Sequence, residues 1–502
     1  MTSSIFDEVL YDYQKDAADR IATQGRILLA DQPGLGKTLM VLGALEKADL
    51  FRFGKNILII TPIVNAHTAW LHTIEQFVKP RHDVKVIDIS RGTVHKKRAA
   101  IEGNLSGICN IIIANHNAID EVDTGKHRVS SLDMVVFDAV IIDESHMVLP
   151  ITNHKKLTRF WKGLRKIRMH EDCMRIAVSG TPDRGKLENR YGTWMFLDPW
   201  QTEQNRWAWL ESNFWLYEQK VSKTRTVKMV GSLKAQDSWL AKDKAMMIRR
   251  TKAEVLSQLP PKRYVDVEIE LHKAQIDDYL FARDTFRDSE PKEPMVFATR
   301  ARQISNCQWT TSWEPIVGGK SAKLDWLLEW LDSRGYMDES LPGKVVIASQ
   351  FSKVLHWLQE ELKARGVIAA ILDGSTPQAA RDSIQTNFQE PDGIRVVLLS
   401  GQMGVGITLD AADDLIMFDS PYDPDRIEQI EDRVHRASSI HNVTIWNLIG
   451  VGTIDQAIME KMSARYKITR RVMDASRGVD IERSVMATLT NKMSDASSKL
   501  DS

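Results

Sequence analysis

The sequence predicts an α/β protein with two doubly wound, parallel-sheet lobes and a helical insertion between them. Short apolar segments alternate with amphipathic ones over the first 200 residues, and the same alternation returns after residue 320. The stretch between is instead rich in Trp, Lys and Glu. Strands that are apolar throughout are typical of parallel sheets, whose two faces are both covered by helices. We therefore expect lobe 1 at 1–199, the insertion and linker at 200–320, lobe 2 at 321–480 and a polar tail at 481–502.

The expected strands are short, and most are followed by a turn or an amphipathic segment. In the first lobe they are Arg26–Ala30, Asn56–Thr61, Asp83–Ile87, Ile108–Ala114, Ala139–Asp143 and Met174–Ser179. Helices are expected after Lys37, across Ala66–Phe77 and around Leu187–Phe196. In the last third the expected strands are Lys344–Ala348, Ile368–Leu372, Val396–Ser400, Asp414–Phe418 and Val443–Leu448. The helices there are expected at Ser352–Arg365, Ala379–Phe388 and Pro424–His435.

The middle region contains tryptophans that recur at roughly helical intervals. They are Trp200, Trp207, Trp209, Trp215 and Trp239. We interpret them as the apolar face of a helical core rather than as a stacking platform for bases, because this spacing suits one buried helix face. Pro260-Pro261 ends any helix before it and is expected to mark a joint between domains.

Composition narrows the class of protein. The 67 Lys and Arg residues balance 67 Asp and Glu residues, which excludes coating of nucleic acid by bulk charge but permits one basic groove. The three cysteines (Cys109, Cys173, Cys307) form no CxxC pair, so a disulfide framework or zinc site is not expected and a reducing compartment is favoured. No segment has the pattern of a signal peptide or of a membrane helix. We expect a cytoplasmic protein without a membrane segment.

The segment Ala30-Asp31-Gln32-Pro33-Gly34-Leu35-Gly36-Lys37-Thr38 lies between an expected strand and an apolar helical run. A loop in this setting wraps nucleotide phosphates. Gly34 and Gly36 let the backbone approach the phosphates. Lys37 brings charge to the β- and γ-phosphates, and Thr38 offers a hydroxyl to Mg²⁺. The general pattern has Gly where this chain has Asp31, but the Gly-x-Gly-Lys-Thr end is intact. The cofactors predicted by this loop are ATP and Mg²⁺.

A second motif, Val140-Ile141-Ile142-Asp143-Glu144-Ser145-His146, is an apolar strand that ends in two carboxylates. Asp143 can hold Mg²⁺ through water, and Glu144 can orient or deprotonate the attacking water. The carboxyl ends of the strands are where open α/β sheets bind their ligands. Together with the phosphate loop, the motif predicts ATP hydrolysis.

A third motif lies in the last quarter of the chain, in the segment 429–436. If this segment is helical, Gln429, Arg433 and Arg436 share one face at i, i+4 and i+7. An anion cradle in one half and a row of basic residues in the other suggest a nucleotide site shared between two domains. ATP would then close a cleft.

With these motifs the sequence resembles the superfamily 2 helicases and, within them, the SNF2-type DNA translocases, over roughly Tyr11 to Ile458. The phosphate loop is similar to the family's D-E-x-G-x-G-K-T, and Ser179-Gly180-Thr181-Pro182 resembles its T-G-T-P. The most family-specific stretch is Ile248–Val255 followed by Leu259–Lys262, which fits R-R-x-K-x-x-V…L-P-x-K. The resemblance implies two RecA-like lobes and ATP-driven translocation along double-stranded DNA.

The resemblance also implies a role for each matching residue. Catalysis is assigned to Lys37, Asp143, Glu144, Arg433 and Arg436, with the two arginines acting on the γ-phosphate. Nucleotide contacts are assigned to Gln14, Gly34, Leu35, Gly36, Lys37, Thr38, Gly406 and Gln429, and the metal to Thr38 and Asp143. Coupling of hydrolysis to domain movement is assigned to His146, Ser179 and Thr181. DNA contacts are assigned to Thr61, Pro62, Asn115, Gln350, Ser375 and Thr408, with Trp70 following the Thr61-Pro62 segment.

The sequence leaves other functions to be weighed against the translocase. A strand-separating helicase on single-stranded DNA or RNA is disfavoured by the Arg249-Arg250 segment and by the lack of an obvious separating hairpin. A binding module without catalysis is disfavoured because every group that does chemistry is present, and a small-molecule kinase would not need the second lobe. The basic clusters His95–Arg98 and Lys223–Lys228 read as solvated surface rather than as a DNA track. We expect a motor of a bacterium or virus that binds double-stranded DNA in repair, recombination or replication, with an unidentified protein partner possible.

Overall fold

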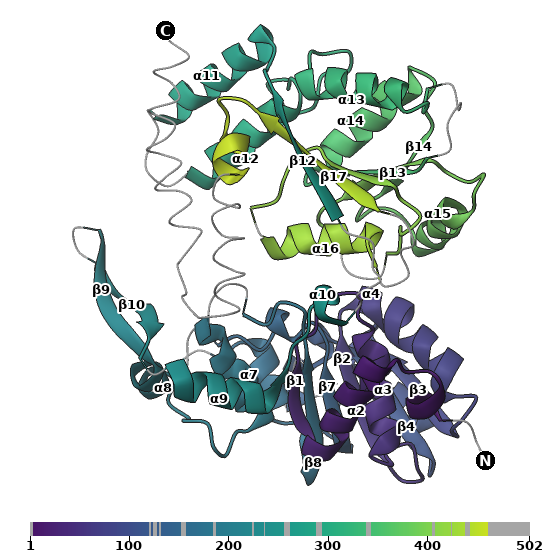
Figure 1. The fold of residues 1–502 in the computed structure, drawn as a ribbon. Helices are drawn as coiled ribbons and strands as arrows, with labels where there is room; N and C mark the ends of the chain where they lie inside the picture. Colours follow the sequence, from purple (N-terminus) through teal and green to yellow (C-terminus); the bar gives the residue numbers. More distant parts are fainter. Residues whose placement is uncertain are drawn as a thin grey trace. The chain divides into compact units, whose positions relative to one another are not determined.

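The computed structural model describes residues 4–119, 122–123, 128–129, 132–151, 157–183, 187–222, 225–234, 236–255, 262–287, 294–337, 343–403, 407–422, 424–436 and 442–459. The chain divides into two compact units between residues 257 and 258. Each unit is built on its own parallel sheet (Figure 1). The joint expected at Pro260-Pro261 lies outside the described residues. The division into two lobes, an insertion and a tail stays a prediction.

The first unit contains a seven-stranded sheet in the order β11-β1-β8-β7-β2-β4-β3, and all of its strand pairs are parallel. Its strands are β1 (Arg26–Leu29), β2 (Asn56–Thr61), β3 (Val84–Ile89), β4 (Cys109–Asn115), β7 (Val136–Ile142), β8 (Arg168–Val178) and β11 (Met247–Ile248). Parallel strands end at the same edge, and only β8 separates β1 from β7. The segments that follow β1 and β7 therefore leave the sheet at one edge, two strands apart.

The helices of the first unit are α1 (Ile5–Glu8), α2 (Asp12–Gln24), α3 (Lys37–Lys47), α4 (Ile63–Asn65), α5 (Val94–Asn104), α6 (Arg159–Leu164), α7 (Arg190–Leu197), α8 (Arg206–Asn213), α9 (Gln236–Met246) and α10 (Lys252–Val255). The helix expected across Ala66–Phe77 is present, but it is wound as π-helix at Ala66–Leu71 and Ile74–Val78. Several helices begin where a side-chain oxygen accepts a backbone N–H of the first turn. Thr93, Thr158 and Asn205 act in this way at α5, α6 and α8.

The second unit contains a six-stranded sheet in the order β12-β17-β16-β13-β15-β14, again with only parallel pairs. Its strands are β12 (Lys262–Ile269), β13 (Val345–Ser349), β14 (Ala369–Leu372), β15 (Val396–Ser400), β16 (Asp414–Met417) and β17 (Val443–Gly450). Its helices are α11 (Lys273–Arg287), α12 (Pro294–Asn306), α13 (Ala322–Ser333), α14 (Ser352–Lys363), α15 (Gln378–Gln389) and α16 (Pro424–Val434). The α/β fold class with two parallel sheets is confirmed.

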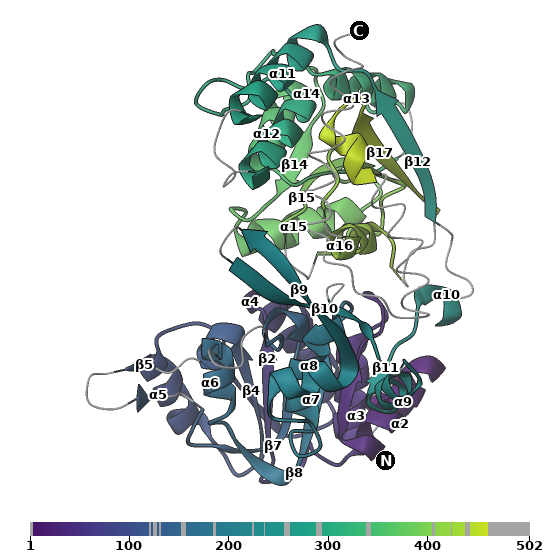
Figure 2. The same cartoon turned by 90° about the vertical axis from the view of Figure 1, so that its left-hand side faces the viewer.

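The edge strand β12 was not expected from the sequence. It pairs with β17 along its whole length, from Lys262 opposite Val443 to Ile269 opposite Gly450 (Figure 2). Most of its residues are only partly buried or exposed, and its sequence carries charged residues between apolar ones. A strand of this kind lacks the continuous apolar run that marks the central strands of a parallel sheet. Its pairing partner lies far away in the chain, so the pairing is decided by tertiary structure.

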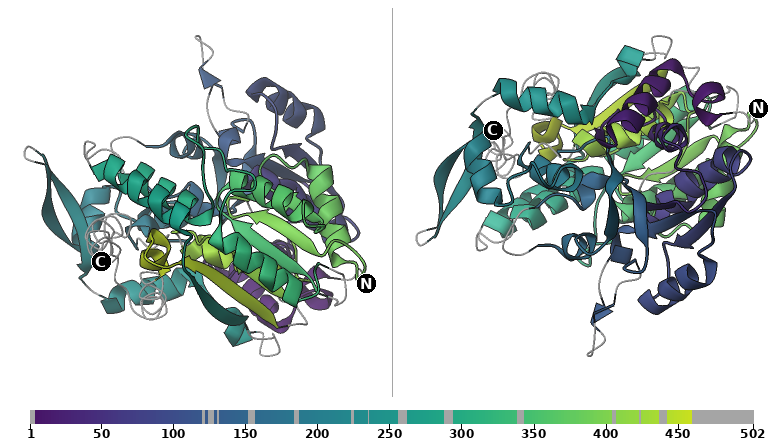
Figure 3. Two further views of the ribbon diagram at one scale, coloured as in Figure 1. Left: turned by 90° about the horizontal axis from the view of Figure 1, so that it is seen from above. Right: turned by 90° about the horizontal axis from the view of Figure 1, so that it is seen from below.

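The middle region also departs from the helical expectation. It contains α8, α9, α11 and α12, but also the antiparallel pair β9 (Phe214–Ser222) and β10 (Arg225–Leu233). This hairpin extends from the base near α8 as a two-stranded ribbon of its own (Figures 1 and 3). This hairpin was not predicted from the sequence. A further two-stranded pair, β5 (Val122–Asp123) and β6 (Arg128–Val129), lies elsewhere in the first unit.

The tryptophans of the middle region divide between core and surface. Trp209 and Trp239 are buried with Trp194, their ring centroids lying 4.5–5.6 Å apart. The core interpretation therefore holds for these two. It is wrong for Trp200 and Trp215, which are 85% and 62% exposed.

Both faces of each sheet are covered by apolar side chains. In β2, Leu58 and Ile60 belong to one core, whereas Ile57 and Ile59 belong to the core on the opposite face. Alternation along a strand places successive side chains on opposite faces, so a continuous apolar run fills two cores at once. The second sheet repeats this pattern along β13.

All three cysteines are buried and unpaired. Burial raises the pKa of the Cys109 and Cys173 thiols to about 12. These thiols are therefore neutral at physiological pH. Among the described helices, none is long and apolar enough to cross a membrane.

Candidate nucleotide site

The phosphate loop connects β1 to α3 and depends on two glycines in left-handed backbone conformations. Gly34 has φ +84° and Gly36 has φ +80°. A Cβ on Gly36 would lie 2.3 Å from the Gln14 side-chain nitrogen, so no other residue fits there without moving Gln14. Helix α3 begins at Lys37 directly after Gly36, which offers no side-chain cap to the first turn. The first N–H groups of a helix are donors suited to a phosphate.

The Lys37 side chain folds back onto the phosphate loop. Its Nζ donates hydrogen bonds to the backbone oxygens of Asp31 (2.8 Å) and Gln32 (3.2 Å). The cation is therefore held beside the turn formed by Gly34 and Gly36. Thr38, the next residue, is partly buried in the first turn of α3.

Gln14 supports the loop from α2. Its Nε2 donates to the Leu35 carbonyl oxygen over 3.0 Å, and its Oε1 accepts the Tyr11 N–H at 3.0 Å. Tyr13 also donates its hydroxyl proton to the Leu35 oxygen, over 3.2 Å. Gln14 is buried and both ends of its amide are engaged. Its predicted contact with the nucleotide stays a prediction.

Asp31 has a partner that the sequence pattern did not reveal. Its fully buried carboxylate accepts the backbone N–H of Arg250 at 2.8 Å and forms an ion pair with the Arg250 guanidinium. Asp31 is the residue that departs from the general phosphate-loop pattern, and Arg250 belongs to the family-specific basic stretch. The ion pair therefore connects the unusual acidic residue of the phosphate loop with the basic stretch that is specific to the family.

Arg249 fastens the same stretch to two further segments of the site. Its Nη1 donates to the backbone oxygens of Ala30 (2.9 Å) and Gly180 (3.1 Å). The backbone N–H of Lys252 donates to Gln32 Oε1 over 2.7 Å. The segment 249–252 therefore holds the phosphate loop and the Ser179–Pro182 turn in a fixed arrangement.

Asp143 lies at the end of β7 in a dense set of donors. Its Oδ2 accepts hydrogen bonds from Thr61 Oγ1 (2.8 Å), Asn65 Nδ2 (3.1 Å) and Trp70 Nε1 (3.0 Å). Its Oδ1 accepts the backbone N–H of Glu144 at 2.9 Å. A carboxylate oxygen has two lone pairs, so Oδ1 retains an acceptor position for a water or a metal-bound water. This fits the predicted role of Asp143 as an indirect Mg²⁺ ligand.

Glu144 has a backbone conformation that is uncommon for its residue type. Its φ is +46° and its ψ is +45°, in the left-handed region. Residues other than glycine are seldom found there, and such outliers occur often at functional sites. Glu144 Oε2 lies 3.3 Å from His146 Nδ1.

His146 connects the acidic motif with the Ser179–Pro182 segment. Its Nδ1 also lies 2.8 Å from Ser179 Oγ, and Ser179 Oγ accepts the backbone N–H of Thr181 over 3.1 Å. Glu144, His146, Ser179 and Thr181 thus form a continuous polar chain from β7 to the end of β8. The structure brings together all three residues predicted to couple hydrolysis to movement.

His116 was not predicted as a site residue. Its Nε2 lies 2.9 Å from the backbone oxygen of Asp143, and burial lowers its pKa. The neighbouring Asn115 is buried and donates to the Ser90 carbonyl. Thr61 is also buried, beneath Asp143, whereas Pro62 is partly exposed. Contacts of these residues with DNA stay predictions.

In the second unit, Gln350 directly follows β13 and is buried. Its backbone N–H donates to Asp419 Oδ1 over 3.0 Å, while its side-chain nitrogen has no hydrogen-bond partner among the described residues. A Cβ on Gly401 would lie only 1.7 Å from that nitrogen, so any other residue there would displace the end of the Gln350 side chain. The exposed Ser375 donates its hydroxyl to Asp373 Oδ1 over 2.7 Å. Thr408 is fixed by its backbone N–H, which donates to a glutamine side chain of α15.

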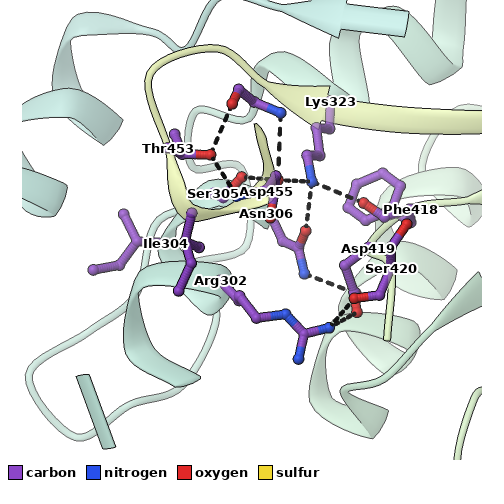
Figure 4. Close-up of polar contacts among 12 residues, drawn as sticks. Arg302, Ile304, Ser305, Asn306, Lys323, Phe418, Asp419, Ser420, Thr453 and Asp455 are labelled. Carbon is purple, nitrogen blue, oxygen red and sulfur yellow. Dashed lines mark hydrogen bonds and ion pairs between the residues drawn. The ribbon is translucent and has the colours of Figure 1, made fainter. Parts of the chain in front are cut away.

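A buried polar cluster supports the strand ends of this unit (Figure 4). Lys323 is fully buried, and its Nζ donates to Asp455 Oδ2 (2.6 Å), to the Phe418 oxygen (2.9 Å) and to Asn306 Oδ1 (3.2 Å). Asn306 Nδ2 in turn donates to Asp419 Oδ2 over 2.9 Å. A buried charge is tolerated only when it is paired and hydrogen-bonded, as it is here.

The same carboxylate of Asp419 also binds Arg302, whose Nη2 lies 3.2 Å from Oδ1. The polar cluster therefore links α12, α13 and the ends of β13 and β16. It fixes the backbone of Gln350 through Asp419. No local sequence pattern predicted it, since its members come from five separated segments.

The predicted row of basic residues lies on and beyond α16. The helix ends at Val434, so Arg436 follows it rather than lying in it. Arg436 donates through Nη2 to the Ile407 oxygen (2.8 Å) and through Nε to the Asp432 oxygen (3.3 Å), and burial lowers its pKa. Arg433 is buried and Gln429 is partly buried. Gly406 lies outside the described residues.

Strand β12 holds α16 from the other side. Lys262 Nζ lies 2.8 Å from Glu431 Oε2, and the Tyr264 hydroxyl donates to the same oxygen over 2.9 Å. Burial would lower the pKa of Lys262, but Glu431 and Asp432 outweigh it and raise that pKa. The unexpected edge strand thus fixes the helix that precedes Arg436.

A glycine-rich loop at a helix start, with two carboxylates at a neighbouring strand end, defines a P-loop nucleotide-binding domain, here followed by a second α/β unit. The model of the SNF2-related domain matches residues 17–308, and that of the helicase conserved C-terminal domain matches residues 322–438. The chain therefore belongs to the SNF2-related family of helicase-like ATPases. The predicted resemblance is confirmed.

Curated relatives span the two matched domains. A Caenorhabditis elegans homolog of SWI/SNF-related matrix-associated actin-dependent regulator of chromatin subfamily A-like protein 1 is 26% identical over 93% of this chain and 62% of the relative. The DNA annealing helicase and endonuclease ZRANB3 of Mus musculus is 24% identical over 92% of this chain and 40% of the relative. The chain thus spans less than two thirds of the length of each of these proteins.

Among solved structures, the Sulfolobus solfataricus SWI2/SNF2 ATPase core in complex with double-stranded DNA is 20% identical. The structural match covers 96% of this chain and 96% of that chain, with a TM-score of 0.39.

Proposed function

We propose that this chain hydrolyses ATP and uses the energy to move along double-stranded DNA. One observation carries the proposal. The polar chain from Glu144 through His146 to Ser179 runs beside a phosphate loop that the SNF2-specific residues Arg249 and Arg250 hold in place. Glu144, which would activate the attacking water, is thereby connected to the Ser179–Pro182 segment, which is expected to couple hydrolysis to domain movement.

The residues of the loop fit a nucleotide with its magnesium ion. The two left-handed glycines leave a turn free of side chains, and the N-terminus of α3 points its donors there. Lys37 would meet the β- and γ-phosphates after leaving the backbone oxygens that it now binds. Thr38 and, through water, Asp143 would hold Mg²⁺, which neutralises charge on the phosphates. Glu144 would accept the proton of the attacking water.

The second unit would supply Arg433 and Arg436 to the nucleotide. A guanidinium added to a developing phosphoryl charge accelerates related reactions by about 10³–10⁵. In this structure the Arg436 guanidinium donates hydrogen bonds to the backbone oxygens of Ile407 and Asp432, which fix its position after α16. Gln429 and Gly406 would complete the contacts with the nucleotide.

Duplex DNA is the proposed track. Pro62 is partly exposed and Ser375 is exposed. Thr61 and Asn115 are the last residues of β2 and β4, and Gln350 and Thr408 follow β13 and β15. The pathway we propose is repair, recombination or replication inside a cytoplasm, and a protein partner would direct the motor. A strand-separating helicase is the second candidate, because the hairpin β9–β10 is the kind of element that separates strands.

The experiment that tests the proposal is steady-state ATP turnover with no nucleic acid, blunt double-stranded DNA, single-stranded DNA and RNA. Stimulation by the blunt duplex alone supports the translocase, and displacement of a triplex-forming strand then tests movement. Stimulation by single strands or RNA alone would favour the strand-separating helicase. No turnover with any of them would contradict both.

A further inference from the structure

The β9–β10 hairpin has two chemically different faces. On one face, Phe214 and Leu233 are buried in the core of the first unit, and Leu216 and Val230 pack partly against it. Side chains alternate along a strand, so Trp215 and Tyr217 lie on the opposite face. They are 62% and 52% exposed. The inner face explains how the hairpin is anchored, but it gives no reason for two large aromatic rings on the outer face.

A glycine on β10 lies beside the aromatic face and leaves room for the Tyr217 ring. Residue 231 lies across from it on β10 and is glycine. A Cβ at Gly231 would lie 3.5 Å from the Tyr217 ring and 2.8 Å from the Trp215 carbonyl oxygen. The missing side chain lets the Tyr217 ring lie against the strand, so that its other side stays open. Large rings held in this way lose little conformational freedom when a second ring stacks on them.

Positive charge accompanies the rings. Lys234 Nζ lies 5.1 Å from the centroid of the Trp215 ring. Lys228 lies on the other face of the hairpin, opposite Glu218, and forms an ion pair with Glu211. The sequence of the two strands adds Lys220 and Arg225 and has Glu218 as its acidic residue. In a chain with zero net charge, this is a local basic excess.

Aromatic rings beside cations match one class of partner. Single-stranded nucleic acid offers bases for stacking and phosphates for the lysines. The bases of a duplex are already stacked on one another and expose only their edges and the backbone. We propose that the outer face of β9–β10 binds unpaired DNA beside the duplex that the motor tracks, with bases stacked on Trp215 and Tyr217. The position beside a tracked duplex rests on the proposed function, whereas the binding of unpaired DNA to Trp215 and Tyr217 does not.

The test is fluorescence anisotropy with a 5′-labelled dT oligonucleotide and, separately, with a blunt duplex, using the full chain. The double variant W215A/Y217A should bind the oligonucleotide about 100-fold more weakly, since each lost stack costs about tenfold. W215F/Y217F keeps both rings and should bind within about threefold of the unmodified chain. Trp200→Ala removes an exposed tryptophan outside the hairpin and should change nothing. Binding of the duplex should be equal in all four proteins.

Salt dependence separates stacking from charge. Lys234→Gln should reduce the slope of log affinity against log salt by about 0.7, the value for one phosphate contact on a single strand. The alanine double variant should keep the slope and lose affinity at every salt concentration. Unchanged oligonucleotide binding in that variant would overturn the inference, and so would an equal loss for the duplex. Tighter binding of an rU oligonucleotide than of dT would overturn the assignment to DNA.

The titrations need no ATP turnover, so they also separate this inference from the proposed function. If duplex DNA fails to stimulate turnover while dT binding still depends on Trp215 and Tyr217, the translocase proposal fails and the hairpin inference stands. If the duplex stimulates turnover and the double variant binds dT normally, the hairpin inference fails alone.

Discussion

Trp70 Nε1 donates a hydrogen bond to Asp143 Oδ2 over 3.0 Å, and both side chains are buried. Trp70 lies in wide helical turns after β2, whereas Asp143 ends β7. The resemblance associated Trp70 with a segment along the nucleic acid backbone. Its position beneath the acidic motif gives it a second role, which is to orient the carboxylate expected to hold Mg²⁺.

Trp70→Phe should therefore impair magnesium use. The variant keeps an aromatic ring but removes one donor from Asp143 Oδ2, and loss of such a supporting bond typically costs about 10- to 100-fold in metal affinity or activity. The measurement is ATP turnover against Mg²⁺ concentration. Trp161→Phe is the matched control, because buried Trp161 donates its Nε1 proton to the Leu149 carbonyl instead. Equal loss of turnover in both variants would mean general destabilisation.

Glu144→Gln should leave ATP binding intact and reduce hydrolysis by about 10²–10⁴, since it removes the base while keeping the shape. The measurements are binding of a fluorescent ATP analogue and turnover under saturating ATP. Glu102→Gln, at an exposed position of α5, should behave as the unmodified chain. Near-normal turnover of Glu144→Gln would refute the role of Glu144.

Arg250→Met should destabilise the first unit more than Asp31→Asn does. The first change leaves a fully buried carboxylate without its cation, which typically costs about 3–5 kcal/mol. The second change leaves a neutral amide beside a partly exposed arginine, so its cost should be smaller. Urea unfolding compares the two. The double variant should recover part of the loss, and a strictly additive loss would show that the two side chains do not interact.

Acid should destabilise the first unit partly through His116. Burial lowers its pKa in the folded state, so the unfolded chain binds the proton more readily. The neutral form is favoured in the fold, and its contribution to stability is complete above the unfolded pKa of about 6.5 and is lost as pH falls toward the folded pKa. His116→Gln should flatten the loss of unfolding free energy below about pH 6.5. His95→Gln, at an exposed site, should leave the profile unchanged.

Arg436→Ala should lower ATP turnover by about 10³ or more, while nucleotide affinity stays within about tenfold. The reason is that a guanidinium on the γ-phosphate acts mainly on charge that develops during transfer. Arg365→Ala in the same unit removes an arginine that is paired with Glu361 on α14, and serves as the control. Turnover equal to that of the control would mean that the second unit does not complete the site.

Much of the fold followed from local patterns. Strand β2 was predicted with its exact bounds, and β15 as well, because each is an apolar run that fills the two cores of its sheet. The phosphate loop and the acidic motif were recognisable because their chemistry needs residues that are close in sequence. The helix expected across Ala66–Phe77 is present, but its π-type winding at Ala66–Leu71, which includes Trp70, was not predicted.

The sequence by itself determined two parallel α/β sheets and the SNF2 family, and it predicted the residues that would handle ATP, since apolar runs and short motifs are local properties. Tertiary structure alone decided the Asp31–Arg250 pair, whose members are 219 residues apart, the edge pairing of β12 with β17, and the exposure of Trp215. Such features depend on which distant segments meet in the folded chain, and local sequence patterns do not specify those long-range contacts.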